Sequence, residues 1–285
     1  MHTNDNPCIY FYKDICGGFC VKFTKMHGCG NDYIYIEEKQ IKGMPEDEIK
    51  KLARRMSDRK NGIGSDGLII IAPSEEADIR MIMYNADGSR GKMCGNGIRC
   101  LCKYVFERKI IIKTRFFVET DSGIKEVRLT CNEKNVTGVK VNMGKYKNVK
   151  KRSYILDGKK YDITYVEVGN PHAVIWVPDL ERTLVEKVGK YLEYHEDFPD
   201  RVNTEFVQYI GRNTIALRVW ERGSGETLAC GTGACAAYVA GSLAGILGDE
   251  VTVNMPGGSV VVSYDSAQDN IFLYGDANEV FTGEY

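Results

Sequence analysis

The sequence lacks several patterns that would assign it to a well-known class of protein. It contains no Cys-x-x-Cys pair, and its four histidines (2, 27, 172 and 195) lack the spacing of a zinc site. Gly28-x-Gly30 is without the third glycine of a dinucleotide-binding turn, and no Gly-x-x-x-x-Gly-Lys-Ser/Thr loop occurs. We therefore expect neither a metal nor a cofactor.

Neither sign of charge dominates the chain, because 38 Lys and Arg nearly balance 39 Asp and Glu. This balance gives no electrostatic attraction to nucleic acid or to an anionic membrane, so we expect a small-molecule partner. The first twenty residues mix charged side chains with Pro and Gly, and they lack the long apolar run of a secretory signal. Ten cysteines without the pattern of a disulfide scaffold then predict a reducing, cytoplasmic setting.

One uncharged segment, Thr227–Gly248, is long enough to span a bilayer. It is rich in Gly and Ala, however, and its hydropathy is low for a membrane span. Small residues of this kind suit a helix packed tightly inside a sheet. We expect a buried core helix and no membrane association.

Two copies of a Cys-Gly-x-Gly signature stand out, at residues 94–97 and 230–233. Each cysteine precedes a predicted helix, whose N-terminal N–H groups and dipole stabilise a thiolate. Packing gives no reason to repeat a cysteine in the same glycine frame, whereas inversion of a stereocentre by two groups requires an acid and a base of similar pKa. The pair predicts Cys94 and Cys230 as these two groups.

The two halves of the chain follow one plan. The first predicts strands at 21–24 and 33–37 around a glycine loop (27–32), a helix after Pro45, strands at 68–72 and 79–84, a helix after Cys94 and a hairpin around 121–123. The second repeats these landmarks, and the distance from the first asparagine to the cysteine agrees (94 − 31 = 63 and 230 − 170 = 60). This indicates two lobes related by a pseudo-twofold axis, with a site in the cleft between them.

Several polar residues around the two cysteines are candidates for substrate binding. Removing an α-proton from an amino acid spreads charge into its carboxylate, so donors are needed there; the expected donors are the backbone N–H groups of Gly95, Asn96, Gly231 and Thr232. Asn31, Asn85, Asn170 and Asn203 fit either turns or contacts with a zwitterion. The Glu221–Arg222 pair fits a second head group or a surface ion pair, and His172 fits a core histidine or an aid to thiol deprotonation.

From about Val21 to the C-terminus, the sequence resembles the diaminopimelate epimerase family. The resemblance is carried by residues 23–32 (Phe-Thr-Lys-Met-His-Gly-Cys-Gly-Asn-Asp), 85–89, 93–100, 169–172 and 221–233. It implies an α/β fold of the α+β type, with two pseudo-symmetric lobes that each curl a mostly antiparallel sheet around a central helix. It also implies the pyridoxal-independent interconversion of LL- and meso-diaminopimelate in lysine and peptidoglycan-precursor synthesis, by a homodimer.

The resemblance implies a role for each candidate residue. Cys94 and Cys230 are the acid and base, and His172 and Glu221 set their protonation. The reacting carboxylate is held by Gly95, Asn96, Gly231 and Thr232, and the distal amino acid group by Asn31, Asn85, Asn170, Asn203, Glu221 and Arg222. The expected domains are an extension (1–20), a first lobe (21–137, joined by the last strand, 276–285) and a second lobe (138–275).

Two departures and two rival functions stand beside this resemblance. The extension precedes the usual start of the family, and Gly67 replaces a glutamine that contacts the distal end in some members. A proline racemase or 4-hydroxyproline epimerase is the nearest rival, but that branch carries histidine where this chain has Asn96. A non-catalytic amino-acid-binding relative is the second rival, and the presence of both thiols disfavours it.

Overall fold

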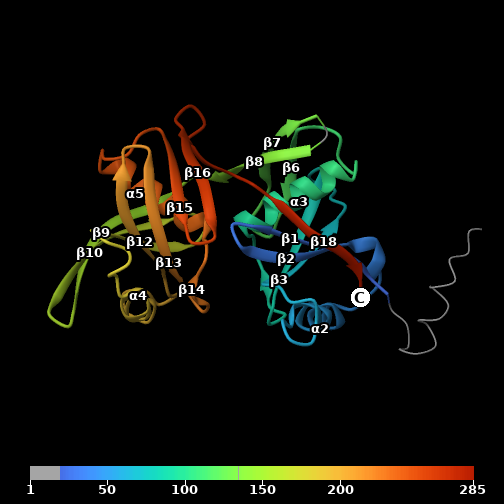
Figure 1. The fold of residues 1–285 in the computed structure, drawn as a ribbon, viewed down its shortest axis with the longest axis horizontal. Coiled ribbons are helices and arrows are strands. Elements are labelled where there is room, and N and C mark those ends of the chain that lie inside the picture. Colours follow the sequence, from blue (N-terminus) through green and yellow to red (C-terminus); the bar gives the residue numbers. More distant parts are fainter. Residues whose placement is uncertain (1–19, 134) are drawn as a thin grey trace, which may run out of the picture.

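Two lobes lie side by side along the long axis of the molecule (Figure 1). The computed structural model describes residues 20–133 and 135–285, so Cys8, Cys16 and most of the predicted extension lie outside the described residues. Each lobe curls its strands around one central helix, α3 (Gly95–Glu107) in the first and α5 (Gly231–Leu243) in the second. The predicted fold class, two lobes with a central helix each, is confirmed.

The first lobe combines antiparallel hairpins with two parallel pairings. β1 pairs with β2 and β3 with β4 in antiparallel fashion, while the β2–β3 and β4–β6 pairs are parallel. β6, β7 and β8 then form an antiparallel meander. The elements are β1 (Lys22–Gly28), β2 (Asn31–Glu37), the 3-10 helix η1 (Glu38–Ile41), α2 (Glu46–Ser57), β3 (Gly67–Ala72), β4 (Ile79–Asn85), β5 (Arg90–Gly91), β6 (Arg115–Glu119), β7 (Lys125–Asn132) and β8 (Asn135–Gly144).

The second lobe repeats these pairings in the same order. β10–β11 and β12–β13 are antiparallel, whereas β11–β12 and β13–β15 are parallel. Its elements are β9 (Lys147–Leu156), β10 (Lys159–Glu167), β11 (Pro171–Trp176), α4 (Val185–Glu193), β12 (Asn203–Gly211), β13 (Thr214–Glu221), β14 (Gly225–Thr227), β15 (Glu250–Met255), β16 (Gly258–Asp265) and β17 (Asn270–Gly275). The order of pairings confirms the internal repeat.

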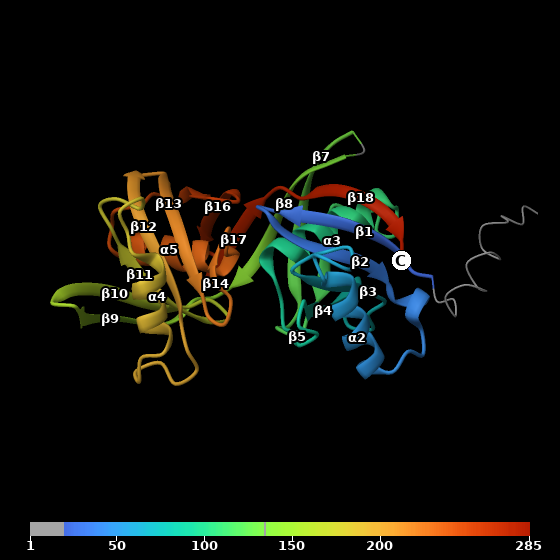
Figure 2. The same ribbon diagram turned by 60° about the horizontal axis from the view of Figure 1, so that its bottom comes forward.

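Two strands connect the lobes. β8 pairs with β7 of the first lobe and with β17 of the second, and it passes between them in Figure 2. The last strand, β18 (Asn278–Glu284), leaves the second lobe and pairs with β1. Hydrogen bonds therefore run between the lobes, and the exact domain boundaries stay a prediction.

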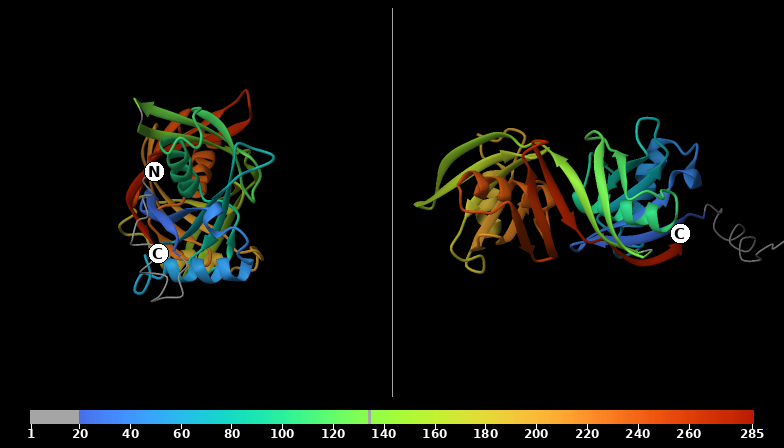
Figure 3. Two further views of the ribbon diagram at one scale, coloured as in Figure 1. Left: turned by 90° about the vertical axis from the view of Figure 1, so that its right-hand side faces the viewer. Right: turned by 90° about the horizontal axis from the view of Figure 1, so that it is seen from above.

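The central helix of the second lobe, α5, is buried along most of its length. Its many Ala and Gly residues let the surrounding strands approach closely, which confirms the core helix predicted in the uncharged segment. Viewed along the long axis, α3 and α5 both lie within the ring of strands (Figure 3, left). No helix in the described part of the chain is long and apolar enough to cross a membrane.

A fully buried arginine fixes the first turn of α3. Arg99 Nη1 donates to the Gly95 carbonyl (3.1 Å), and Nε donates to the Asp276 carbonyl (3.0 Å). Asp276 lies between β17 and β18. Arg99 therefore ties the turn after Cys94 to the segment by which the chain returns from the second lobe.

The glycine loop predicted at residues 27–32 is shorter than expected. β1 continues to Gly28 and β2 begins at Asn31, so only Cys29 (φ 53°) and Gly30 (φ 76°) form the turn. Two consecutive positive φ angles match the right-handed twist of a tight hairpin. The turn places Asn31 at the start of a strand, where its side chain reaches Cys94.

We predict that Gly67→Ala destabilises the fold, because a methyl carbon at Gly67 would lie 2.2 Å from the Tyr84 carbonyl oxygen. Relieving such a contact costs about 1–3 kcal/mol, seen as a lower midpoint of thermal unfolding. Gly211→Ala is the control, since nothing lies within 4 Å of a methyl carbon there. Equal midpoints for the two variants would contradict this reading of Gly67.

Candidate active site

The N-termini of α3 and α5 meet between the lobes. A methyl carbon on Gly95 would lie 3.8 Å from the Gly231 Cα, and one on Gly231 would lie 3.7 Å from the Gly95 Cα. The Leu273 side chain closes the contact, at 3.3 Å and 3.1 Å from the same two positions. Glycine at the first position of each helix therefore allows the two helix ends to touch.

Each of these helices is capped by its cysteine. The Cys94 and Cys230 sulfurs accept hydrogen bonds from the Gly97 and Gly233 N–H groups, at 3.4 Å in both lobes. The backbone angles of the two caps are also alike, with φ −131° and ψ 124° at Cys94 and φ −127° and ψ 111° at Cys230. The repeat thus places two equivalent thiols at two positive helix ends that face one site.

The Cys94 thiol forms its hydrogen bonds with neutral polar groups. Its sulfur donates to Asn31 Oδ1 at 3.1 Å, and Asn96 Nδ2 reaches the same oxygen at 3.4 Å. Burial raises the pKa of Cys94 above its ordinary value, and hydrogen bonds from the Gly97 N–H and the Tyr33 hydroxyl partly offset this. The net shift is upward, so Cys94 ionises less readily than a free cysteine.

The Cys230 thiol lies in a more negative environment. Burial raises the pKa of Cys230 well above its ordinary value, and the charges of Glu221 and Glu205 raise it further. The Thr232 hydroxyl lies 3.4 Å from the sulfur and opposes the shift. Of the two thiols, Cys230 is the one whose proton is held more strongly.

Glu221 lies near both thiols. Its Oε1 accepts a hydrogen bond from the Thr227 hydroxyl at 2.5 Å. Its charge raises the pKa of Cys230 and also that of Cys94 across the lobes. Burial raises the pKa of Glu221 itself above the usual range. The structure therefore brings the predicted acid and base residues together with Glu221.

The predicted partner His172 lies beneath the site, and hydrogen bonds to Asn170 and Glu205 occupy both of its ring nitrogens. Nε2 is 2.9 Å from Asn170 Oδ1, and Nδ1 is 2.7 Å from Glu205 Oε1. Within residues 20–133 and 135–285, no hydrogen bond joins His172 to either thiol. In this structure His172 therefore supports Asn170, which is a predicted binding residue.

The other predicted binding residues lie at or just beyond the ends of strands. Asn203 Oδ1 accepts from the Arg222 N–H (3.1 Å), and its Nδ2 donates to the Pro171 carbonyl (2.8 Å). The exposed Arg222 donates from Nη1 to the Asp200 carbonyl (2.8 Å). In the first lobe, Asn85 Nδ2 donates to Ser89 Oγ (2.9 Å). Asn203 and Arg222 thus form one group, whereas Asn85 is held by its own turn.

Sequence reasoning missed a charged network that holds Asn31. Asp66 Oδ2 accepts from Asn31 Nδ2 (2.7 Å) and from the Asp32 N–H (3.0 Å). Arg59 pairs with Asp32 (2.6 Å) and with Asp66 (2.8 Å). Asp66 comes just before the strand predicted at 68–72, so parallel pairing of that strand with the one at 33–37 was the signal that could have placed Asp66 beside Asn31. The network aims Asn31 Oδ1 at Cys94.

Sequence reasoning also missed Tyr33 and Glu205. In the first lobe β2 pairs Tyr33 with Gly67, and in the second β11 pairs His172 with Asn203, so Tyr33 and His172 hold equivalent positions. The repeat could have revealed this, because both residues lie two positions after the landmark asparagine. Glu205 was visible as a charge within a buried strand.

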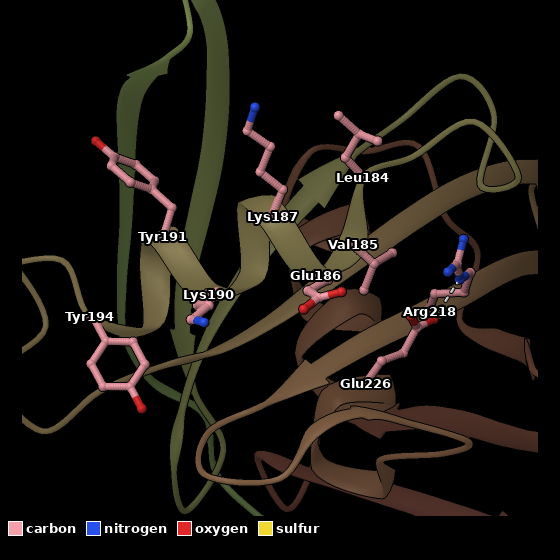
Figure 4. Close-up of a pocket in the computed structure, with 9 residues that line it drawn as sticks. All are labelled: Leu184, Val185, Glu186, Lys187, Lys190, Tyr191, Tyr194, Arg218 and Glu226. Carbon is pink, nitrogen blue, oxygen red and sulfur yellow. Dashed lines mark hydrogen bonds and ion pairs between the residues drawn. The ribbon is translucent and has the colours of Figure 1, made fainter.

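A separate groove lies on the outer face of the second lobe (Figure 4). It has a volume of about 850 Å³, and the Arg218–Glu226 ion pair (2.7 Å) stands at one end. None of the predicted site residues lines it, so we place the active site at the thiols. Its lining residues are Leu184, Val185, Glu186, Lys187, Lys190, Tyr191, Tyr194, Arg218 and Glu226.

Solved structures share this two-lobed fold. A PhzF-family phenazine biosynthesis protein from Bacillus anthracis matches with a TM-score of 0.71 at 18% identity, over 93% of this chain and 99% of that one. A hydroxyproline epimerase from Agrobacterium vitis matches with a TM-score of 0.70 at 14% identity, over 94% and 91% of the two chains. The fold is therefore one that an amino acid epimerase uses.

Sequence comparison is more specific. The sequence model of the diaminopimelate epimerase family matches residues 23–149 and 164–280. Diaminopimelate epimerase from Acetivibrio thermocellus is 45% identical over 279 residues, which cover 93% of this chain and 98% of the relative. The Methanococcus maripaludis enzyme is 43% identical over 277 residues, covering 93% and 99%. The chain belongs to the diaminopimelate epimerase family, which confirms the resemblance.

We predict that a small alkylating reagent modifies Cys94 at lower pH than Cys230, because the pKa of Cys230 is raised further. Glu221→Gln removes a negative charge that raises both pKa values, so both thiols should react at lower pH, with the larger shift at Cys230. Peptide mass spectrometry after timed alkylation across pH measures each site. Glu226→Gln, in the outer groove, should change neither profile.

Proposed function

We propose that the protein interconverts LL- and meso-diaminopimelate in lysine and peptidoglycan-precursor synthesis, with Cys94 and Cys230 acting on opposite faces of the reacting carbon. The contact between two cysteine-capped helix N-termini carries this proposal. Membership of the family supports the choice of substrate. The reaction needs a base on one face and an acid on the other, and the repeat supplies one thiol from each lobe.

The proposed reaction balances without an oxidant or a second substrate. One cysteine, as the thiolate, takes the α-proton, and the electron pair of the broken C–H bond moves toward the carboxylate. The other cysteine, as the thiol, gives its proton to the opposite face of the carbon. The stereocentre is inverted, the first cysteine ends as a thiol and the second as a thiolate, and proton exchange with water restores the starting form.

The helix ends provide donors for the charge that develops. The first turn of an α-helix leaves N–H groups without acceptors inside the helix. In α3 and α5 the cysteine sulfur accepts a hydrogen bond from the third of these N–H groups, that of Gly97 or Gly233. The N–H groups of Gly95, Asn96, Gly231 and Thr232 precede those, and we assign them to the reacting carboxylate. Fixed donors stabilise a developing carbanion without reorganising during the step.

The distal amino acid group needs one anionic and one cationic partner. We assign its carboxylate to the Arg222 guanidinium and the Asn85, Asn170 and Asn203 amides, and its ammonium to Glu221. We assign Asn31, whose Oδ1 accepts from the Cys94 thiol at 3.1 Å, to the same distal group. A proline-like substrate has no second head group and would leave Glu221 and Arg222 without a role.

The isotope pattern in D₂O tests the two-thiol mechanism. The thiol that protonates the product exchanges with solvent, whereas the thiol that takes the substrate proton does not return it. Early in the reaction, meso product should therefore carry deuterium at the inverted carbon, while remaining LL substrate keeps protium. Proton NMR, with L-proline in a parallel sample, measures both. Exchange with proline alone would assign the protein to the rival branch.

Loss of either thiol should slow the reaction strongly. We expect Cys94→Ala and Cys230→Ala each to lower kcat by about 10²–10⁴, the usual contribution of a general acid or base. Cys131→Ala removes a partly exposed thiol on β7 and should keep full activity. A Cys94→Ala variant that exchanged the α-proton at the wild-type rate would overturn the assignment of Cys94.

We also propose a cytoplasmic homodimer that uses the edge of β18. Among the described residues β18 pairs only with β1, so its other edge is open. Val280 and Phe281 on this strand are 52% and 44% exposed. An open edge with apolar side chains favours pairing with a second copy of the chain.

Phe281→Asp should convert the dimer to a monomer, because a charge at the edge would be buried against the second copy. Sedimentation at micromolar concentration measures the mass. Ile155→Asp is the control, since Ile155 on β9 is 70% exposed and lies in the other lobe. A wild-type protein that sediments as a monomer would contradict the proposed dimer.

A further inference from the structure

Arg99 on α3 carries a charge into the interior of the protein. Its side chain is fully buried, and an arginine cannot be deprotonated in a protein. In the described part of the chain its hydrogen-bond partners are two backbone carbonyl groups and one thiol, with no carboxylate among them. Burying a charge without an opposite charge is costly, so the contacts of this guanidinium need an explanation.

Two glycines, one from each lobe, make room for the guanidinium of Arg99. A methyl carbon at Gly28, the last residue of β1, would lie 2.9 Å from Arg99 Nη2. A methyl carbon at Gly275, the last residue of β17, would lie 3.0 Å from Nε. Nη2 also reaches the Cys29 sulfur at 3.6 Å. The backbones of both lobes therefore approach the guanidinium closely, beside the first turn of α3.

One contact of Arg99 leads directly to the reacting carboxylate. Arg99 Nη1 donates to the Gly95 carbonyl at 3.1 Å. That carbonyl and the Asn96 N–H belong to one peptide group, whose resonance couples the oxygen to the nitrogen. A cation at the oxygen draws electrons through the group, and hydrogen bonds that follow one another in this way strengthen each other. The Asn96 N–H is therefore a stronger donor than an ordinary peptide N–H.

The second lobe shows that a central helix does not require this arginine for packing. Arg99 lies five residues after Cys94, and Cys235, five residues after Cys230, holds the equivalent position in α5. Cys235 is fully buried as well. Burial raises its pKa to about 12, which keeps it a neutral thiol, and the charge of Arg99 acts against this shift. An uncharged residue therefore fills the equivalent place, and the field of Arg99 extends to α5.

We propose that Arg99 is a positioning residue that polarises the Gly95–Asn96 peptide group and so strengthens the hydrogen bond from the Asn96 N–H to the reacting carboxylate. This inference rests on the proposed function, in which that N–H holds this carboxylate. Removal of the α-proton moves an electron pair toward the carboxylate, so a stronger donor stabilises the transition state more than the bound substrate. Arg99 therefore acts on kcat more than on KM.

Arg99 also has an anchoring contact, which the test must separate from the polarised peptide. Nε donates to the carbonyl of Asp276, at 3.0 Å, in the segment that returns from the second lobe. Loss of that bond alone would loosen the link between the lobes. Such a loss would lower the midpoint of thermal unfolding and would impair substrate binding and the chemical step together. It would leave the electron distribution of the Gly95–Asn96 peptide group unchanged.

NMR of the free protein tests the polarisation without substrate. Protein labelled with carbon-13 at glycine carbonyls and nitrogen-15 at asparagine amides gives a coupled signal only for Gly-Asn pairs, which occur at 30–31, 95–96 and 169–170. Asn31→Asp and Asn170→Asp each remove one signal and so identify that of Gly95–Asn96. In Arg99→Met we expect this signal to move upfield in both dimensions, while the 169–170 signal stays in place. An unmoved Gly95–Asn96 signal would overturn the proposal, whatever substrate the enzyme uses.

Steady-state kinetics test the consequence for the reaction. Arg99→Met should lower kcat for diaminopimelate about tenfold with KM nearly unchanged, because it weakens a donor whose complete loss costs about 10²–10³ in kcat. Arg99→Lys keeps the charge, so it should show the same changes in signal and kcat to a smaller extent; it also serves if Arg99→Met does not fold. Arg218→Met is the matched control, because Arg218 anchors the Leu180 carbonyl away from the thiols and should keep wild-type constants.

The remaining outcomes separate the proposal from its alternatives. A lower kcat together with a higher KM and an unmoved Gly95–Asn96 signal would make Arg99 an anchor only. A moved signal with wild-type kcat would show that the polarised N–H does not act on the reacting carboxylate, and would overturn the proposal. A wild-type protein without activity on diaminopimelate would instead overturn the proposed function, and the labelled signal would still decide whether Arg99 polarises the peptide group.

Discussion

The structure depends on the contact between the N-termini of α3 and α5. Two positive helix ends repel each other, and the fold holds them together because Gly95 and Gly231 let the backbones touch and Arg99 anchors the turn after Cys94. The repulsion is relieved when an anion lies between the ends. The arrangement that brings the two cysteine caps together therefore also favours the carboxylate of the proposed substrate.

The pseudo-twofold symmetry of the fold suits only one part of the proposed reaction, the inversion of the reacting carbon. The reacting carbon needs two equivalent groups, and the two lobes supply cysteine caps with the same hydrogen bond and nearly the same backbone angles. The configuration at the distal head group does not change in the proposed reaction. Its site therefore needs no pair of equivalent groups from the two lobes. Here the lobes differ: Tyr33 and Ile69 in the first correspond to His172 and Glu205 in the second. At these equivalent positions the histidine and the carboxylate stand in the second lobe, which also carries Glu221 and Arg222.

Much of this arrangement could be predicted from the sequence, and the reasons differ by element. The repeat predicted two lobes because each of its landmarks is a short stretch of neighbouring residues that can be recognised in the sequence. The helices were predicted from the Cys-Gly-x-Gly signatures and from the spacing of apolar residues. The network of Asp66, Asp32 and Arg59 could not be predicted, because it depends on the parallel register of β2 and β3, which bring distant segments together. The contacts of His172 could not be predicted for the same reason, because strand register brings Glu205 and Asn170 to its two ring nitrogens. The role toward the thiols that the resemblance implies for His172 stays a prediction.

The unequal pKa values of the two thiols in the free protein are consistent with a reaction that interconverts epimers of nearly equal energy. In the free protein the pKa of Cys230 is raised further than that of Cys94, because burial acts with the charges of Glu221 and Glu205. A substrate ammonium beside Glu221 would offset that charge, and the offset would be larger at Cys230, where the Glu221 charge acts most strongly after burial. With the ammonium placed as we propose, binding would bring the two thiol pKa values closer. Matched values are what a reaction that runs in both directions through one acid and one base requires.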